Sequence, residues 1–162
     1  MDFQERLQKA IQRGQKQRDK KASDARAKEL TEEDFKSRHS TYRLQLSEQI
    51  ENCLQQIPHQ FPGFQYETIY GDRGWGGACF RDDIGAGPKG KRANFYSRIE
   101  LTIRPFSSYH VLELAAKATI RNKEIFNRSP YEELADADPD RFVELIDLWI
   151  LEFAELYAAQ DA

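Results

Sequence analysis

The segment from Ala93 to Phe106 constrains the fold most strongly, because its side chains alternate between two chemical classes. A mostly apolar set, at odd positions, alternates with a polar set at even positions: Phe95, Ser97, Ile99, Leu101 and Ile103 against Tyr96, Arg98, Glu100, Thr102 and Arg104. This two-residue period is typical of a β-strand with one face on a core and the other in solvent.

Two more strands are predicted just before it, at Phe64–Tyr70 and Trp75–Asp82, with the turn residues Gly71–Gly74 between them. The glycine-rich segment Asp83–Arg92 is predicted to be a loop leading into the third strand. Connections this short favour an antiparallel meander, because parallel strands need a longer crossover. Three strands with one apolar face are not stable alone, so helices are expected to cover that face.

Helices are predicted on both sides of the sheet in the sequence. One starts at Thr31, a good N-cap, and stops at Pro58. After the sheet, Val111–Ile120 is apolar on most sides and is predicted to be a central buried helix, and Ser129–Glu132 has the form of a capping box that opens a short helical turn. The last helix follows Asp138 and has the most periodic apolar face: Phe142, Leu145, Ile146, Trp149, Ile150, Phe153, Leu156 and Tyr157.

Residues 1–30 are predicted to form a charged helical arm, because their apolar residues gather at the start and almost none follow Ile11. Phe3, Leu7 and Ile11 are spaced four apart on one stripe, which is the geometry of a helix that docks in a groove. Residues 31–162 are expected to be a single domain. The predicted class is α+β: a small three-stranded antiparallel meander with helices packed on one face, preceded by a long N-terminal helical arm.

The charge of the chain is unevenly distributed. The net charge is −3 over 162 residues, but residues 1–30 contain nine Lys or Arg against five Asp or Glu, whereas residues 129–162 contain one Arg against ten acidic residues. A basic start and an acidic end can attract each other within a chain, between copies, or through separate partners. No run is long and apolar enough for a membrane helix, so a cytoplasmic protein without membrane contact is expected, with Cys53 and Cys79 as free thiols.

No catalytic residue, cofactor or metal site is predicted. The Gly85–Arg92 segment approaches a phosphate-binding loop but lacks its hydroxyl residue and its helix, and the three histidines lack zinc spacing. Asp72, Asp82 and Asp83 could converge near one end of the sheet beside Arg98, which leaves an enzyme with a spatially assembled site as one alternative.

The function expected from these patterns is a non-enzymatic interaction or accessory subunit. It would bind a protein partner, or a further copy of itself, through the arm and the open sheet face, because aromatic residues and Arg are enriched in interface cores. The candidate residues on that face are Trp75, Arg81, Tyr96, Arg98, Glu100 and Arg104. The other alternative is a nucleic-acid-binding accessory protein that contacts phosphates through the arm and the Pro88–Arg92 loop, with Lys89, Lys91 and Arg92.

Overall fold

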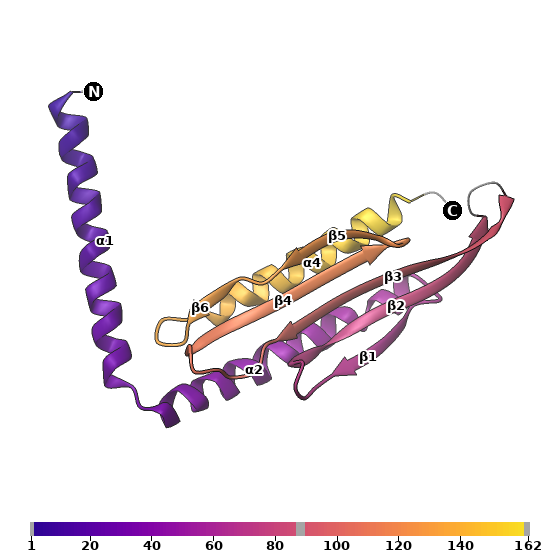
Figure 1. Ribbon diagram of the computed structural model, residues 1–162, viewed down its shortest axis with the longest axis horizontal. Helices are drawn as coiled ribbons and strands as arrows, with labels where there is room; N and C mark the ends of the chain where they lie inside the picture. The colour runs from indigo at the N-terminus through magenta and orange to yellow at the C-terminus, as the bar shows by residue number, and fades with distance from the viewer. Residues whose placement is uncertain (1, 87–89, 161–162) are drawn as a thin grey trace.

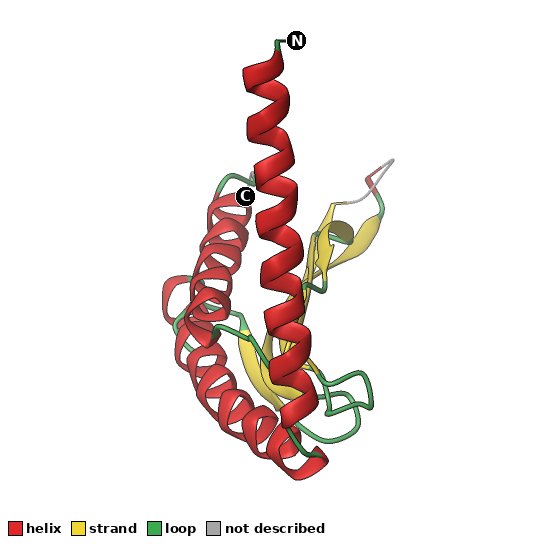
Figure 2. Cartoon of the chain, turned by 90° about the vertical axis from the view of Figure 1, so that its left-hand side faces the viewer, coloured by secondary structure: helices red, strands yellow, loops and turns green. Residues whose placement is uncertain are grey.

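An antiparallel sheet and two long helices form two layers, and a third long helix stands apart from them (Figure 1). The computed structural model describes residues 2–86 and 90–160. The helices are α1 (Phe3–Glu29), α2 (Glu32–Leu54), α3 (Ile57–Gln60) and α4 (Pro139–Ala158). The strands are β1 (Gln65–Ile69), β2 (Trp75–Ala86), β3 (Arg92–Ile103), β4 (Val111–Ile120), β5 (Lys123–Arg128) and β6 (Tyr131–Glu133). Both α2 and α4 cover the same face of the sheet, which leaves its other face open (Figure 2).

The sheet is a meander in the order β1-β2-β3-β4-β5, with β6 paired to the start of β4. The predicted α+β class and antiparallel meander are confirmed. The predicted loop at Asp83–Arg92 is wrong in extent, because β2 continues to Ala86 and β3 begins at Arg92, and these two residues pair.

The prediction of three strands is wrong, because β4, β5 and β6 lie where helical segments were expected. Leucine and alanine favour helices, so the composition of Val111–Ile120 predicts a helix. However, the segment also alternates, and its even positions are the buried ones: Leu112, Leu114, Ala116, Ala118 and Ile120. Arg121 and Asn122 both have positive φ angles, 49° and 71°, as a two-residue hairpin turn of the I′ type requires.

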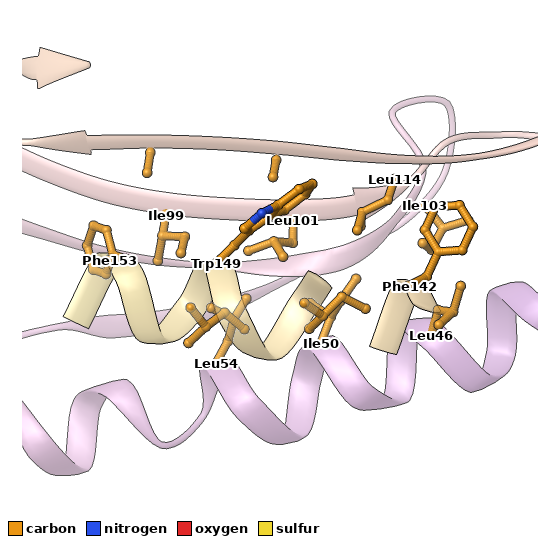
Figure 3. Packing of buried hydrophobic residues seen from close by; sticks show 14 of the residues in the cluster. Leu46, Ile50, Leu54, Ile99, Leu101, Ile103, Leu114, Phe142, Trp149 and Phe153 are labelled. Atoms are coloured by element: carbon orange, nitrogen blue, oxygen red, sulfur yellow. The ribbon is translucent and has the colours of Figure 1, made fainter. Parts of the chain in front are cut away.

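The core lies between the sheet and the two covering helices (Figure 3). The residue Thr31 forms a capping box with Asp34 at the start of α2, as its sequence indicated. The last helix also begins as predicted, at the N-cap Asp138 followed by a proline. Apolar side chains from α2 and α4 meet those of β3 and β4: Leu46, Ile50, Leu54, Phe142, Trp149 and Phe153 with Ile99, Leu101, Ile103 and Leu114.

Helix α1 stands clear of the two-layer body at one end, whereas α4 ends at the opposite end (Figure 1). The side chains of residues 3–26 are exposed apart from Ser23, which is half-buried. Among the described residues, no helix combines the length and apolar character needed to cross a membrane.

Candidate interaction surfaces

The tip of α1 exposes a stripe of large apolar side chains, which we call the arm tip (Phe3, Leu7 and Ile11). Their exposed fractions are 76%, 47% and 51%. Residues four apart lie on one side of a helix, so the three side chains form a continuous strip. Basic residues border it, with Arg6 and Arg13 lining the same shallow hollow as Phe3 and Leu7. The arm tip is therefore apolar in the middle and positively charged at its margin.

The base of α1 is fixed to the body by polar contacts to one carboxylate. Arg26 donates two hydrogen bonds to Oδ1 of Asp136, from Nη2 at 2.6 Å and from Nε at 3.1 Å, and the Ser23 hydroxyl donates to Oδ2. The hydrogen bond from Ser23, and to a smaller extent those from Arg26, lower the pKa of Asp136, so this carboxylate is charged at neutral pH. Leu30, just after α1, packs against the core. These contacts set the direction in which the arm leaves the body.

Next to the arm base, aromatic rings and two histidines pack together. The ring of Phe35 stacks on His110 at a centroid distance of 4.1 Å, and His110 Nε2 lies 2.6 Å from a carboxylate oxygen of Glu32. The rings of Phe106 and His39 pack nearly perpendicular to each other, at a centroid distance of 5.7 Å. Although distant in sequence, His39 and His110 are thus brought to one region. No group of three or more His, Cys, Asp or Glu side chains suited to a metal ion occurs within residues 2–86 and 90–160.

The open face of the sheet carries a network of ion pairs centred on Arg98. Its Nη2 lies 2.8 Å from Oε1 of Glu67 and 2.9 Å from Oε1 of Glu100, and Arg73 also reaches Glu100 at 2.8 Å. Burial lowers the pKa of Arg98, but the hydrogen bonds that its guanidinium donates to Glu100 and Glu67 raise this pKa above the ordinary value. These charges, which come from β1, β3 and the turn that contains Arg73, pair with one another as in a cross-strand ladder.

Only part of the predicted sheet-face set lies on this open face. Tyr96 is placed with Arg98 and Glu100, and Arg104 lines a hollow at the end of the sheet beside Asp72 and Glu113. The predicted position of Trp75 and Arg81 is wrong. They lie opposite Ile103 and Ser97, which are buried under the helices, and directly paired residues share a face of the sheet.

Their contacts agree with this placement. The guanidinium carbon of Arg43 on α2 lies 4.2 Å above the Trp75 ring. Arg81 donates to the Pro62 carbonyl at 2.9 Å and to Asp83 at 2.7 Å. The short connections in the sequence predict the order of the strands. They do not predict the face of the sheet on which Trp75 lies, because that depends on the register between β2 and β3.

The acidic residues proposed for an enzymatic site do not gather. Asp72 lies in the turn before β2, whereas Asp82 and Asp83 lie toward the far end of that 12-residue strand. A strand rises about 3.3 Å per residue, so roughly 23 Å of β2 separates Asp82 from Trp75. The acidic side chain of Asp83 pairs with Arg81 on the helix-covered side, away from Arg98.

The basic residues proposed to contact phosphates lie at the β2–β3 connection. Lys91 and Arg92 are exposed. Lys89 and Pro88 lie outside the described residues. The phosphate-contact hypothesis therefore stays a prediction.

A further surface, which the sequence interpretation missed, lies between α4 and the end of α2 with the short helix α3. We call it the α2–α4 groove, and its volume is about 340 Å³. It is lined by Gln49, Cys53, Gln56, Ile57, Gln60, Phe61, Asp147, Ile150, Leu151 and Ala154. Two leucines of α4 are exposed here, Leu151 in the lining at 64% and Leu148 beside it at 53%. They lie outside the main apolar face of α4, and this surplus of leucine was the feature in the sequence that could have identified the surface.

Polar contacts join the two walls of the groove. The Gln49 side-chain amide donates to Asp147 at 2.7 Å, and the Cys53 thiol donates to the same oxygen at 3.3 Å. Burial, and to a smaller extent the nearby carboxylate of Asp147, raises the pKa of Cys53 to about 11. The thiol is therefore protonated at neutral pH, so it does not have the character of a nucleophile.

Comparisons of the chain with models of protein families, with curated proteins and with solved structures find no match.

Proposed function

We propose that this protein is a non-enzymatic interaction or accessory subunit that binds another protein chain through its helical arm. The observation that supports this proposal is the arm tip, whose three large apolar side chains are exposed on a helix that stands away from its own body. Fully burying an exposed side chain of this size contributes about 1.5–3 kcal/mol to the free energy of association, and the half-exposed Leu7 and Ile11 contribute less than Phe3. A receiving surface on a partner would therefore gain substantially from all three.

The form of the arm supports a docking role as well. A helix gains most of its stability from packing an apolar face, and residues 12–26 of α1 present a mostly polar surface, so an isolated α1 is marginally stable in water. A partner that covers the tip would stabilise the helix and would bury its apolar strip. The anchor at Asp136 would present the tip in a defined direction, which reduces the orientational freedom lost on binding.

The open face of the sheet is a weaker candidate surface. Its charged side chains already pair with one another around Arg98, so a partner would have to replace these contacts. We therefore assign recognition to the arm and treat the ion-pair network as part of the sheet. We also propose a reducing compartment such as the cytoplasm, since Cys53 and Cys79 are both free.

The basic residues of α1 favour nucleic acid as a second candidate partner. Arg6 and Arg13 border the tip, and the connection near Lys91 and Arg92 adds further positive charge. A phosphate-binding arm would depend on these charges and not on Leu7. The two candidates therefore respond differently to the same substitutions.

Photo-crosslinking in the native cell tests the proposal. A photoreactive residue at position 7 should give a discrete protein adduct, whereas one at Gln12, on the opposite side of the same helix, should give much less. Introducing Phe3→Asp should reduce the adduct at position 7. Absence of any protein adduct would overturn the proposal, and an adduct removed by nuclease would assign the arm to nucleic acid.

A further inference from the structure

We infer that the chain bound by the arm is a second copy of this protein, and that the arm tip of each copy docks on the α2–α4 groove of the other. This inference rests on the proposed function and names its partner. It assigns a reciprocal homodimer in which two identical contacts form.

The shape and chemistry of the α2–α4 groove fit an incoming helix. Helices form both of its walls, α4 on one side and the end of α2 with α3 on the other, and an incoming helix can pack its side chains between them. Apolar side chains of Ile57, Phe61, Ile150 and Leu151 line the groove, and the exposed Leu148 extends the apolar surface along α4. This extent matches the arm tip, which presents three large apolar side chains along about two turns of helix.

The charges of the two surfaces are complementary. Arg6 and Arg13 lie beside the arm tip, whereas Glu144 and Glu155 are exposed on the same side of α4 as the two leucines. Asp147 adds a carboxylate at the groove itself. The basic residue nearest in sequence, Arg141, pairs with Glu132 at 2.7 Å. Apolar centres with opposite charge at their margins define one orientation of binding and disfavour others.

The geometry of the anchored arm favours a groove on a second copy over the groove of the same chain. Arg26 and Ser23 hold the base of α1 on Asp136. From this base the arm points away from the body, and its tip stands apart from the end of α4 (Figure 1). A helix of 27 residues is about 40 Å long. The arm can therefore extend across a neighbouring molecule without leaving its anchor.

One chain that carries both surfaces can close the assembly by a two-fold axis. Each arm then occupies the groove of the other copy, so neither a free tip nor a free groove remains. The same contacts repeated head to tail would produce open chains. Reciprocal exchange by the anchored arms therefore explains why the tip and the groove occur together in one sequence.

Mixing two variants tests this arrangement directly. Leu7→Asp disables the tip but keeps the groove, and Leu151→Asp disables the groove but keeps the tip. Each should weaken self-association by about tenfold or more in sedimentation velocity, because a carboxylate enters an apolar contact. An equimolar mixture should regain dimers, since one intact tip can still meet one intact groove. Only contact between chains can produce this recovery.

Two matched controls accompany the variants. Gln12→Asp adds the same charge on the opposite side of α1, and Leu44→Asp alters a leucine of α2 that is exposed to 62%, close to the 64% of Leu151. Both controls should associate as the wild type does. The melting temperature of each variant at low protein concentration should equal that of the wild type, because all of these side chains are exposed.

The inference is overturned if the wild-type protein stays monomeric at high concentration, or if Leu7→Asp and Leu151→Asp both still form dimers. It is also overturned if Leu7→Asp lowers the melting temperature of a monomeric protein, because the arm then folds onto its own body. Crosslinking at position 7 separates this inference from the proposed function. An adduct with a different protein contradicts the homodimer only, whereas no adduct contradicts both.

Discussion

At the residue scale, burial determines the charge state of the side chains that a sequence leaves ambiguous. His39 is 3% exposed, and its Nε2 lies 3.0 Å from the carbonyl oxygen of Arg104. A carbonyl only accepts hydrogen bonds, so Nε2 carries the proton and donates it. Burial lowers the pKa of His39, with the neighbouring Arg43 acting in the same direction and the hydrogen bond acting against them. The native imidazole is therefore neutral at pH 7.

This histidine predicts how stability depends on pH. The unfolded chain binds a proton near the ordinary pKa of 6.5, whereas native His39 does so only at lower pH. Its contribution to stability is therefore fully present above the unfolded pKa and is lost as the pH falls through about 6.5 toward the native pKa. His39→Gln should make the urea midpoint less sensitive to a change from pH 7.5 to pH 5.5.

His59→Gln is the matched control, because His59 is exposed in α3. This variant should keep the pH dependence of the wild type. An unchanged dependence in His39→Gln would show that His39 does not titrate as its burial implies. The measured interval, pH 7.5 to pH 5.5, lies above the pH at which most carboxylates take up protons. Asp34 and Asp136 therefore do not dominate the change in the urea midpoint.

At the element scale, α4 has two faces with different roles. Its buried side contributes Phe142, Ile146, Trp149 and Phe153 to the core, and Trp149 packs near Phe126 of β5 at a centroid distance of 6.4 Å. Its outer side exposes leucines next to the α2–α4 groove. The same helix thus joins the two layers of the fold and provides the surface that we assign to self-association.

The two faces should respond differently to truncation. Trp149→Ala removes a side chain that is 8% exposed, and such truncations typically cost about 3–5 kcal/mol of the free energy of unfolding. Leu148→Ala removes the neighbouring side chain, which is 53% exposed, and should change that free energy by less than about 0.5 kcal/mol. Chemical denaturation of monomeric protein measures both. Equal midpoints for Trp149→Ala and wild type would contradict the placement of α4 in the core.

At the scale of the whole molecule, the arm and the two-layer body are joined by few contacts. The arm contributes Ser23 and Arg26 to the anchor on Asp136, whereas the body has a continuous core between the sheet and the helices. Exposed ion pairs typically contribute about 0–1 kcal/mol. The body should therefore fold without the arm.

Removing residues 1–30 tests this independence. The remaining chain, residues 31–162, should melt within about 5 °C of the full chain, because only the anchor and Leu30 are lost. The comparison is made at a concentration at which the full chain is monomeric, with Leu7→Asp as the full-length control. A much larger loss would show that the arm is an integral part of the folded domain.

Several parts of the fold could be predicted because local sequence is sufficient for them. The alternation from Phe95 to Ile103 requires a strand with one buried face, and the structure buries Ile99, Leu101 and Ile103 completely. Similarly, Asp138 and Pro139 start α4, whose apolar period of 3.6 residues allows only one side to face the core. Caps and periodic patterns are properties of neighbouring residues, so they can be recognised without knowing the rest of the fold.

The tertiary structure alone decided the remainder. The leucine- and alanine-rich segment Val111–Ile120 suits a helix by propensity and a strand by its alternation, and the strands β3 and β5 on either side supply the hydrogen-bond partners that decide between the two. The side of the sheet on which Trp75 lies depends on its register with Ile103, and the α2–α4 groove depends on two helices that are about 90 residues apart. These features arise from contacts between distant segments, and a local pattern does not specify such contacts.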